Sequence, residues 1–122
     1  MKNTATGFKR ILTAFTYSGK GFVAAFRSEA AFRQDLIVFV LGTVAVFLFD
    51  LTGMQRALML SSLFLILLME LVNTAIESVV DRISDDYHPL SGKAKDIGSL
   101  LVLIAFINAI CIWTLIFLET YI

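Results

Sequence analysis

The most constraining feature of this 122-residue chain is a run of 22 residues without a charge, at positions 97–118. The run reads IGSLLVLIAFINAICIWTLIFL. A helix needs about 20 apolar residues to cross the hydrocarbon core of a bilayer. Residues 97–118 are therefore predicted to form a transmembrane helix. Hydrophobic residues make up 58% of the chain and charged residues 16%, a balance that favours a membrane protein over a soluble domain.

Two further spans are predicted over residues 33–54 and 57–80. The first carries Asp50 near its far end, and the second carries Glu70 and Glu77. Residues 81–96 contain the only proline and are too short and too polar for a fourth span, so we expect a loop there. The prediction is one all-α membrane domain over residues 1–122, with three transmembrane helices.

The first thirty residues predict an amphipathic helix over residues 6–28. At a helical step of about 100° per residue, their large apolar side chains fall within an arc of about 120°. These side chains are Phe8, Ile11, Leu12, Phe15, Phe22, Val23 and Phe26. Lys9, Lys20 and Arg27 flank the stripe, which favours a helix lying in the membrane interface. The alternative is a helix packed on the protein itself, and Gly19 and Gly21 could break or bend it.

The placement of Lys and Arg predicts the orientation of the spans. Six precede the apolar run of the first span at residues 36–54: Lys2, Lys9, Arg10, Lys20, Arg27 and Arg33. Three lie in the 81–96 segment, namely Arg82, Lys93 and Lys95, whereas the other loop has only Arg56. Because cytoplasmic loops are enriched in these residues, we expect the N-terminus and residues 81–96 in the cytoplasm. The formal net charge of zero gives no support for nucleic-acid binding.

Acidic side chains share one face of the second predicted span. Glu70, Asn73, Glu77 and Asp81 fall on a stripe about 80° wide. An intramembrane carboxylate costs at least a few kcal/mol, so this stripe should face a protein interior or a water-filled site. If Asp81 marks the interface, Glu70 lies roughly 16 Å deeper. Glu77 could then meet a water-soluble substrate, and Glu70 one that resides in the membrane and needs a general base.

Glu29 is expected at a height similar to that of Glu77, and the two could form an oxygen site for Mg²⁺ completed by substrate phosphates. Five cationic side chains could neutralise phosphate charge there, namely Arg10, Lys20, Arg33, Lys93 and Lys95. Lys93 and Lys95 could equally pair with Asp96. From the residues alone, two functions stay open. One is an enzyme that acts on a lipid with a charged soluble co-substrate, and the other is a small proton- or cation-conducting oligomer.

Three ordered motifs then resemble one family. They are EAAFRQ at 29–34, E-x-x-N-x-x-I-E-x-V-V-D-R at 70–82, and Y-H-x-L-S-G-x-A-K-D-x-G-S at 87–99. Together with TGFKRI and YS-x-KG near the N-terminus, they are similar to the prokaryotic diacylglycerol kinase family. The resemblance implies a homotrimeric kinase of the bacterial inner membrane with shared active sites. Such an enzyme transfers the γ-phosphoryl group of MgATP to 1,2-diacylglycerol, giving phosphatidic acid, and a near alternative is undecaprenol kinase.

The resemblance also implies roles for individual residues. Glu70 would be the general base, supported by Asn73, and Glu29 and Glu77 would hold the metal. The nucleotide site would comprise Arg10, Tyr17, Glu29, Glu77, Asp86, Tyr87, His88, Lys95 and Asp96. Lipid contacts would come from Arg10, Ser18, Ala31, Phe32, Arg33, Gln34, Asp35, Arg56, Glu70 and Ser99.

Overall fold

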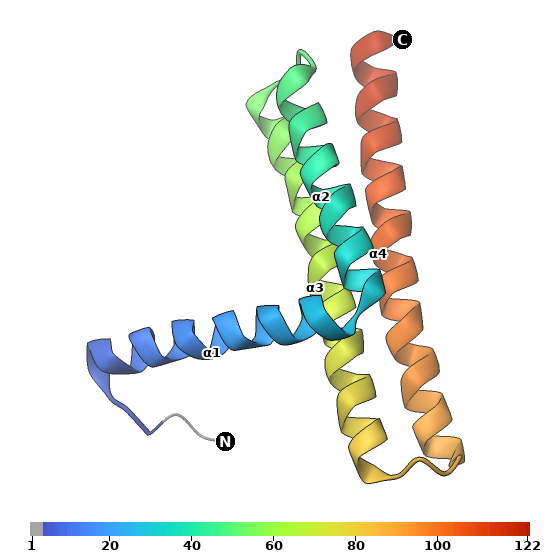
Figure 1. Cartoon of the computed structure of the whole chain (residues 1–122). Coiled ribbons are helices and arrows are strands. Elements are labelled where there is room, and N and C mark those ends of the chain that lie inside the picture. The colour runs from blue at the N-terminus through green and yellow to red at the C-terminus, as the bar shows by residue number, and fades with distance from the viewer. Residues whose placement is uncertain (1–3) are drawn as a thin grey trace.

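The computed structural model describes residues 4–122 and consists of four helices in that range (Figure 1). They are α1 (Gly7–Ser28), α2 (Ala30–Leu48), α3 (Gly53–Ile83) and α4 (Pro89–Tyr121). The all-α prediction is confirmed. Lys2, which contributed to the predicted orientation, lies outside the described residues.

Three of the helices, α2, α3 and α4, are long and apolar enough to cross a membrane, with 19, 31 and 33 residues. They run side by side, and α3 packs against both α2 and α4 (Figure 1). Two apolar clusters join them: Val46, Leu51, Met59 and Ile116 form one, and Ile66, Ala105 and Ala109 form the other. The small residues of α4 let it approach α3 closely, which is how helices associate where lipid offers no hydrophobic driving force.

The turn between α2 and α3 lies earlier than the sequence suggested. Thr52 caps α3: its hydroxyl accepts from the Gln55 N–H at 3.1 Å, and the Gln55 side chain accepts from the Thr52 N–H at 3.0 Å. Arg56 donates to the carbonyls of Val46 and Phe49, both at 3.1 Å. These bonds satisfy backbone groups at both helix ends. Helix α2 therefore ends at Leu48 rather than at residue 54, and α3 begins at Gly53. At its other end α2 starts at Ala30, three residues before the predicted span.

Most of the 81–96 segment is helical rather than a loop. Helix α3 continues to Ile83, and α4 begins at Pro89, so only residues 84–88 lie between them. Proline is favoured at the first position of a helix because no hydrogen-bonding N–H is needed there. His88 adds a cap, since its Nδ1 accepts from the Leu90 N–H at 3.1 Å. Helix α3 therefore extends three residues beyond its predicted span, and α4 begins eight residues, or about two turns, before its own.

Helix α1 leaves the bundle at a steep angle and touches it only with its own C-terminal end, where α2 begins (Figure 1). It is continuous through Gly19 and Gly21, so the suspected break is absent from this helix. Phe22 packs edge-to-face on Phe32 of α2, with 5.6 Å between ring centroids. The apolar stripe of α1 stays exposed. Its burial in the membrane interface stays a prediction.

Candidate active site

Two carboxylates meet inside the bundle. Glu70 of α3 and Asp35 of α2 are each only 7% exposed. The two carboxyl groups are close enough to interact, and Asp35 Oδ2 has no hydrogen-bond partner among the described residues. Two buried carboxylates this close repel each other when both are charged, so a shared proton or a bound cation would stabilise the pair. Asn73, one turn along α3, also interacts with Glu70.

The pairing of Asp35 with Glu70 was not foreseen from the sequence. Asp35 was expected among several lipid contacts in residues 31–35. The sequence did contain one signal: Asp35 lies just inside a predicted span. Placing a carboxylate in a membrane costs free energy unless the carboxylate has a partner. Phe32 and Arg33, from the same stretch, make other contacts. Phe32 is fully buried, and Arg33 Nη1 donates to the Phe26 carbonyl of α1 at 2.6 Å.

Towards the polar end of α3, Lys95 of α4 forms an ion pair with Asp81. Lys95 Nζ lies 2.7 Å from Asp81 Oδ1, and both side chains are exposed. The pair links α3 to α4, and the partner of Lys95 is Asp81 rather than Asp96, which the sequence had offered as one alternative. Exposed ion pairs contribute little to stability because water and salt screen them. Lys95 can therefore exchange Asp81 for another anion at low cost.

Glu29 lies at the junction of α1 and α2, where it ends one helix and precedes the next. A cavity of about 520 Å³ separates α1 from α3 near this point, with Ser28 and Ser78 among its lining residues. Glu29 follows Ser28 and Glu77 precedes Ser78; both glutamates are half-buried, but neither side chain lines this cavity. Within residues 4–122, no three His, Cys, Asp or Glu side chains gather into a site that could hold a metal alone.

The remaining nucleotide residues are dispersed within one chain. Asp86, Tyr87 and His88 are exposed in the connection between α3 and α4. Arg10 lies 19 residues before Glu29, and at 1.5 Å per residue this separates them by about 28 Å along α1. Tyr17 and Ser18 lie between these points on α1, and Asp96 and Ser99 are exposed on α4. One chain therefore does not bring Arg10 to Glu29.

Arg56 is also remote from Glu70. It is bound at the α2–α3 turn, 14 residues or about 21 Å along α3 from the carboxylate. Ala31 and Gln34 are exposed at the start of α2.

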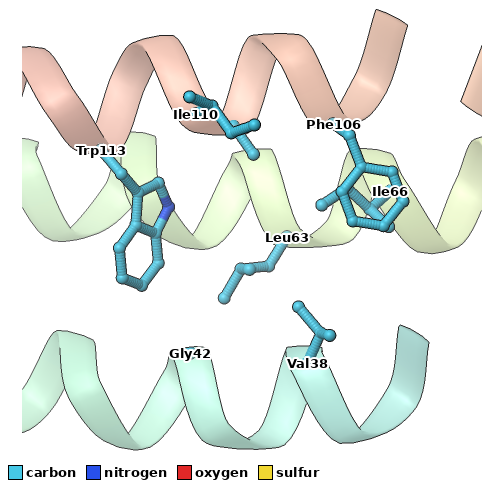
Figure 2. A pocket seen from close by; sticks show the side chains of 8 residues that line it. Val38, Gly42, Leu63, Ile66, Phe106, Ile110 and Trp113 are labelled. Carbon is cyan, nitrogen blue, oxygen red and sulfur yellow. The ribbon is translucent and has the colours of Figure 1, made fainter. Parts of the chain in front are cut away.

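Figure 2 shows an apolar groove that the sequence did not predict. It has a volume of about 330 Å³ and lies over α3, between α2 and α4. Val38 and Ile66 line one end, one turn from Asp35 and Glu70 respectively. Trp113 lines the other end, where its Nε1 donates to Ser62 Oγ at 3.0 Å. The remaining lining residues are Gly42, Leu63, Phe106, Ala109 and Ile110.

Comparison with known proteins identifies the family. A family model described as prokaryotic diacylglycerol kinase matches residues 16–117. The chain belongs to this family. Diacylglycerol kinase of Escherichia coli (strain K12) is 49% identical over 113 residues, which cover 93% of each chain. Diacylglycerol kinase of Pseudomonas aeruginosa is 48% identical over 93% of this chain and 92% of that protein.

More distant members of the prokaryotic diacylglycerol kinase family align over nearly the same range. The enzyme of Haemophilus influenzae is 38% identical over 108 residues, covering 88% of this chain and 92% of its own. The family resemblance inferred from the motifs is therefore confirmed, and the protein is a member of a kinase family. The matched range contains Glu29, Asp35, Glu70, Asn73 and Glu77.

Proposed function

We propose that this protein transfers the γ-phosphoryl group of ATP to the hydroxyl of 1,2-diacylglycerol, giving phosphatidic acid. The observation that carries the proposal is the position of Glu70. This buried carboxylate lies between an apolar groove on one side and the charged end of α3 on the other. A lipid hydroxyl and a soluble phosphate donor approach from these two directions, and the family's relatives bear the name diacylglycerol kinase.

The groove supports a lipid acceptor. Its walls are hydrocarbon, and its volume falls within the range of about 300–1,000 Å³ found for small-molecule sites. It runs from Val38 and Ile66, one turn from the carboxylate pair, to Trp113. Trp113 bonds to Ser62, which is eight residues or about 12 Å along α3 from Glu70. A hydroxyl held at Glu70 therefore leaves an attached acyl chain pointing along this groove.

Glu70 acts as the general base in this proposal. It takes the proton from the acceptor hydroxyl as the oxygen attacks the γ-phosphorus. The bond between that phosphorus and the bridging oxygen breaks, and ADP leaves. Phosphoryl transfer asks mainly for positioning and charge neutralisation, so no covalent enzyme intermediate is required. Asp35 and Asn73, which contact Glu70, hold its carboxylate in place.

Glu29 and Glu77 are the proposed ligands for Mg²⁺. Both are half-buried carboxylates, and each is next in sequence to a residue that lines the cavity between α1 and α3. Mg²⁺ commonly takes one or two protein carboxylates with substrate phosphates and water. The donor set fits that pattern. When bound, the ion neutralises charge that develops on the phosphates. Lys95, in its exposed pair with Asp81, can add a further cation to the nucleotide.

A homotrimer with shared sites is proposed because one chain leaves the nucleotide residues apart. The N-terminal half of α1 extends away from its own bundle (Figure 1). Arg10 and Tyr17 can therefore reach Glu29 and Glu77 of a neighbouring copy more readily than their own. Closed rings of identical subunits are a common way to build such a composite site.

The proposed location is the bacterial inner membrane, with the N-terminus and residues 81–96 on the cytoplasmic side, where ATP is available. The excess of Lys and Arg in these segments supports this orientation.

Transfer of radiolabelled phosphate from ATP to a lipid panel tests the function. Purified protein in mixed micelles should label diacylglycerol faster than undecaprenol. Faster labelling of undecaprenol would reassign the acceptor. No lipid labelling, combined with proton or cation flux in proteoliposomes without ATP, would replace the kinase by a conducting oligomer.

A further inference from the structure

Gly98 of α4 lies against the group that holds Glu70 and is not among the residues to which the sequence assigned a role. It is buried where α4 meets α3. A Cβ added at Gly98 would overlap Oδ1 of Asn73 and would lie 3.3 Å from its Cγ and 3.8 Å from its Cα. The space that a side chain would fill at position 98 is therefore occupied by the Asn73 amide.

The environment of Asn73 explains why this contact matters. Its Oδ1 is buried and has no hydrogen-bond partner among the described residues. The same side chain interacts with Glu70. An ionised carboxylate only accepts hydrogen bonds, so the group of Asn73 that can donate to Glu70 is the amide N–H₂. The amide oxygen then lies in the space beside Gly98 that an added Cβ would occupy.

We infer that Gly98 is a positioning residue that orients the Asn73 amide towards Glu70. The inference rests on the proposed kinase function. Any side chain at position 98 must push α4 away or turn the amide, and turning it removes its donor from Glu70. Gly98 acts through Asn73 and does not itself reach the reacting atoms.

The test is a double-mutant cycle on the full-length protein in lipid micelles. Gly98→Ala should lower kcat at least about tenfold, since a misplacement of 1 Å can cost about a hundredfold. The KM for ATP should stay within about twofold, because the charged end of α3 is untouched. Gly53→Ala is the matched control, since an added Cβ there meets nothing within 4 Å. It should leave kcat unchanged.

Asn73→Ala/Gly98→Ala separates positioning from general packing. Removing the amide makes room for the added methyl group, so the double variant should fold, and its kcat should match that of Asn73→Ala within about twofold. Losses that multiply would overturn the inference, as would unchanged kcat in Gly98→Ala. Failure of the wild-type chain to phosphorylate lipid would instead reject the proposed function.

Discussion

At the scale of single residues, Glu70 has a suitable environment because other elements supply its neighbours. Asp35 comes from α2, and Asn73 lies between Glu70 and α4. Sequence periodicity predicted that Glu70, Asn73 and Glu77 share a face. It could not predict Asp35 as a partner, because a contact between helices depends on their packing and not on spacing within one of them.

Glu70→Gln should remove the proposed base while keeping the shape of the side chain. Transfer to diacylglycerol is expected to fall by about 10²–10⁴-fold, the usual contribution of a positioned acid or base. Binding of MgATP, measured by calorimetry, should stay close to wild type. Glu119→Gln, at the exposed end of α4, is the control. Substantial turnover in Glu70→Gln would remove Glu70 from this role.

Glu77→Gln should weaken the site for Mg²⁺ because a neutral amide is a poorer ligand for a hard cation than a carboxylate. The Mg²⁺ concentration for half-maximal activity and the KM for ATP are both expected to rise, by about tenfold or more. Activity should partly recover at high Mg²⁺. An unchanged Mg²⁺ titration would contradict the metal role.

Asp35→Asn should relieve the repulsion between the two buried carboxylates. The thermal midpoint in detergent is expected to rise by about 2–8 °C, the shift that about 1 kcal/mol produces in a domain of this size. Turnover should fall, since functional sites often gain activity from arrangements that cost stability. A lower midpoint would show instead that Asp35 stabilises the bundle.

At the scale of helices, glycine and alanine decide how closely α2 and α4 approach α3. Gly42 of α2 keeps the groove open: a Cβ there would lie 2.8 Å from Leu63 Cδ1. The sequence showed small residues within apolar spans but not which of them line a groove. That depends on how far the helices separate along their length.

Gly42→Leu should fill the groove beside Leu63 and Val38. The KM for long-chain diacylglycerol is expected to rise about tenfold, since losing a few buried methylene contacts costs 1–2 kcal/mol. The KM for ATP should not change. Val44→Phe adds bulk to the exposed side of the same helix and is the control. An equal effect of Val44→Phe, or loss of the oligomer in Gly42→Leu alone, would argue against an acyl chain in this groove.

At the scale of the whole molecule, the projecting helix α1 separates residues that the proposed reaction needs together (Figure 1). Arg10 and Glu29 are about 28 Å apart along a single helix. A site shared between subunits would bring Arg10 of one copy to Glu29 of another without bending α1.

Mixing two inactive subunits tests the shared site. Arg10→Ala and Glu70→Gln chains, unfolded together and reconstituted in equal amounts, should recover activity, because some sites would take Arg10 and Glu70 from different intact copies. Random assembly makes about a quarter of the sites complete if the two residues come from different subunits. Each variant reconstituted alone is the control. No recovery in the mixture would place both residues in one chain.

The sequence by itself determined three apolar spans, an amphipathic first helix, the shared face of Glu70, Asn73 and Glu77, and the family. These properties follow from composition, periodicity and local motifs, which need no knowledge of the fold. Only the tertiary structure decided that α4 begins at Pro89 and that Asp35 meets Glu70. It also decided that the Asn73 side chain packs against Gly98 and that an apolar groove begins one turn from the carboxylates. Each of these depends on which faces of separate helices come into contact, and spacing along one helix carries no information about that.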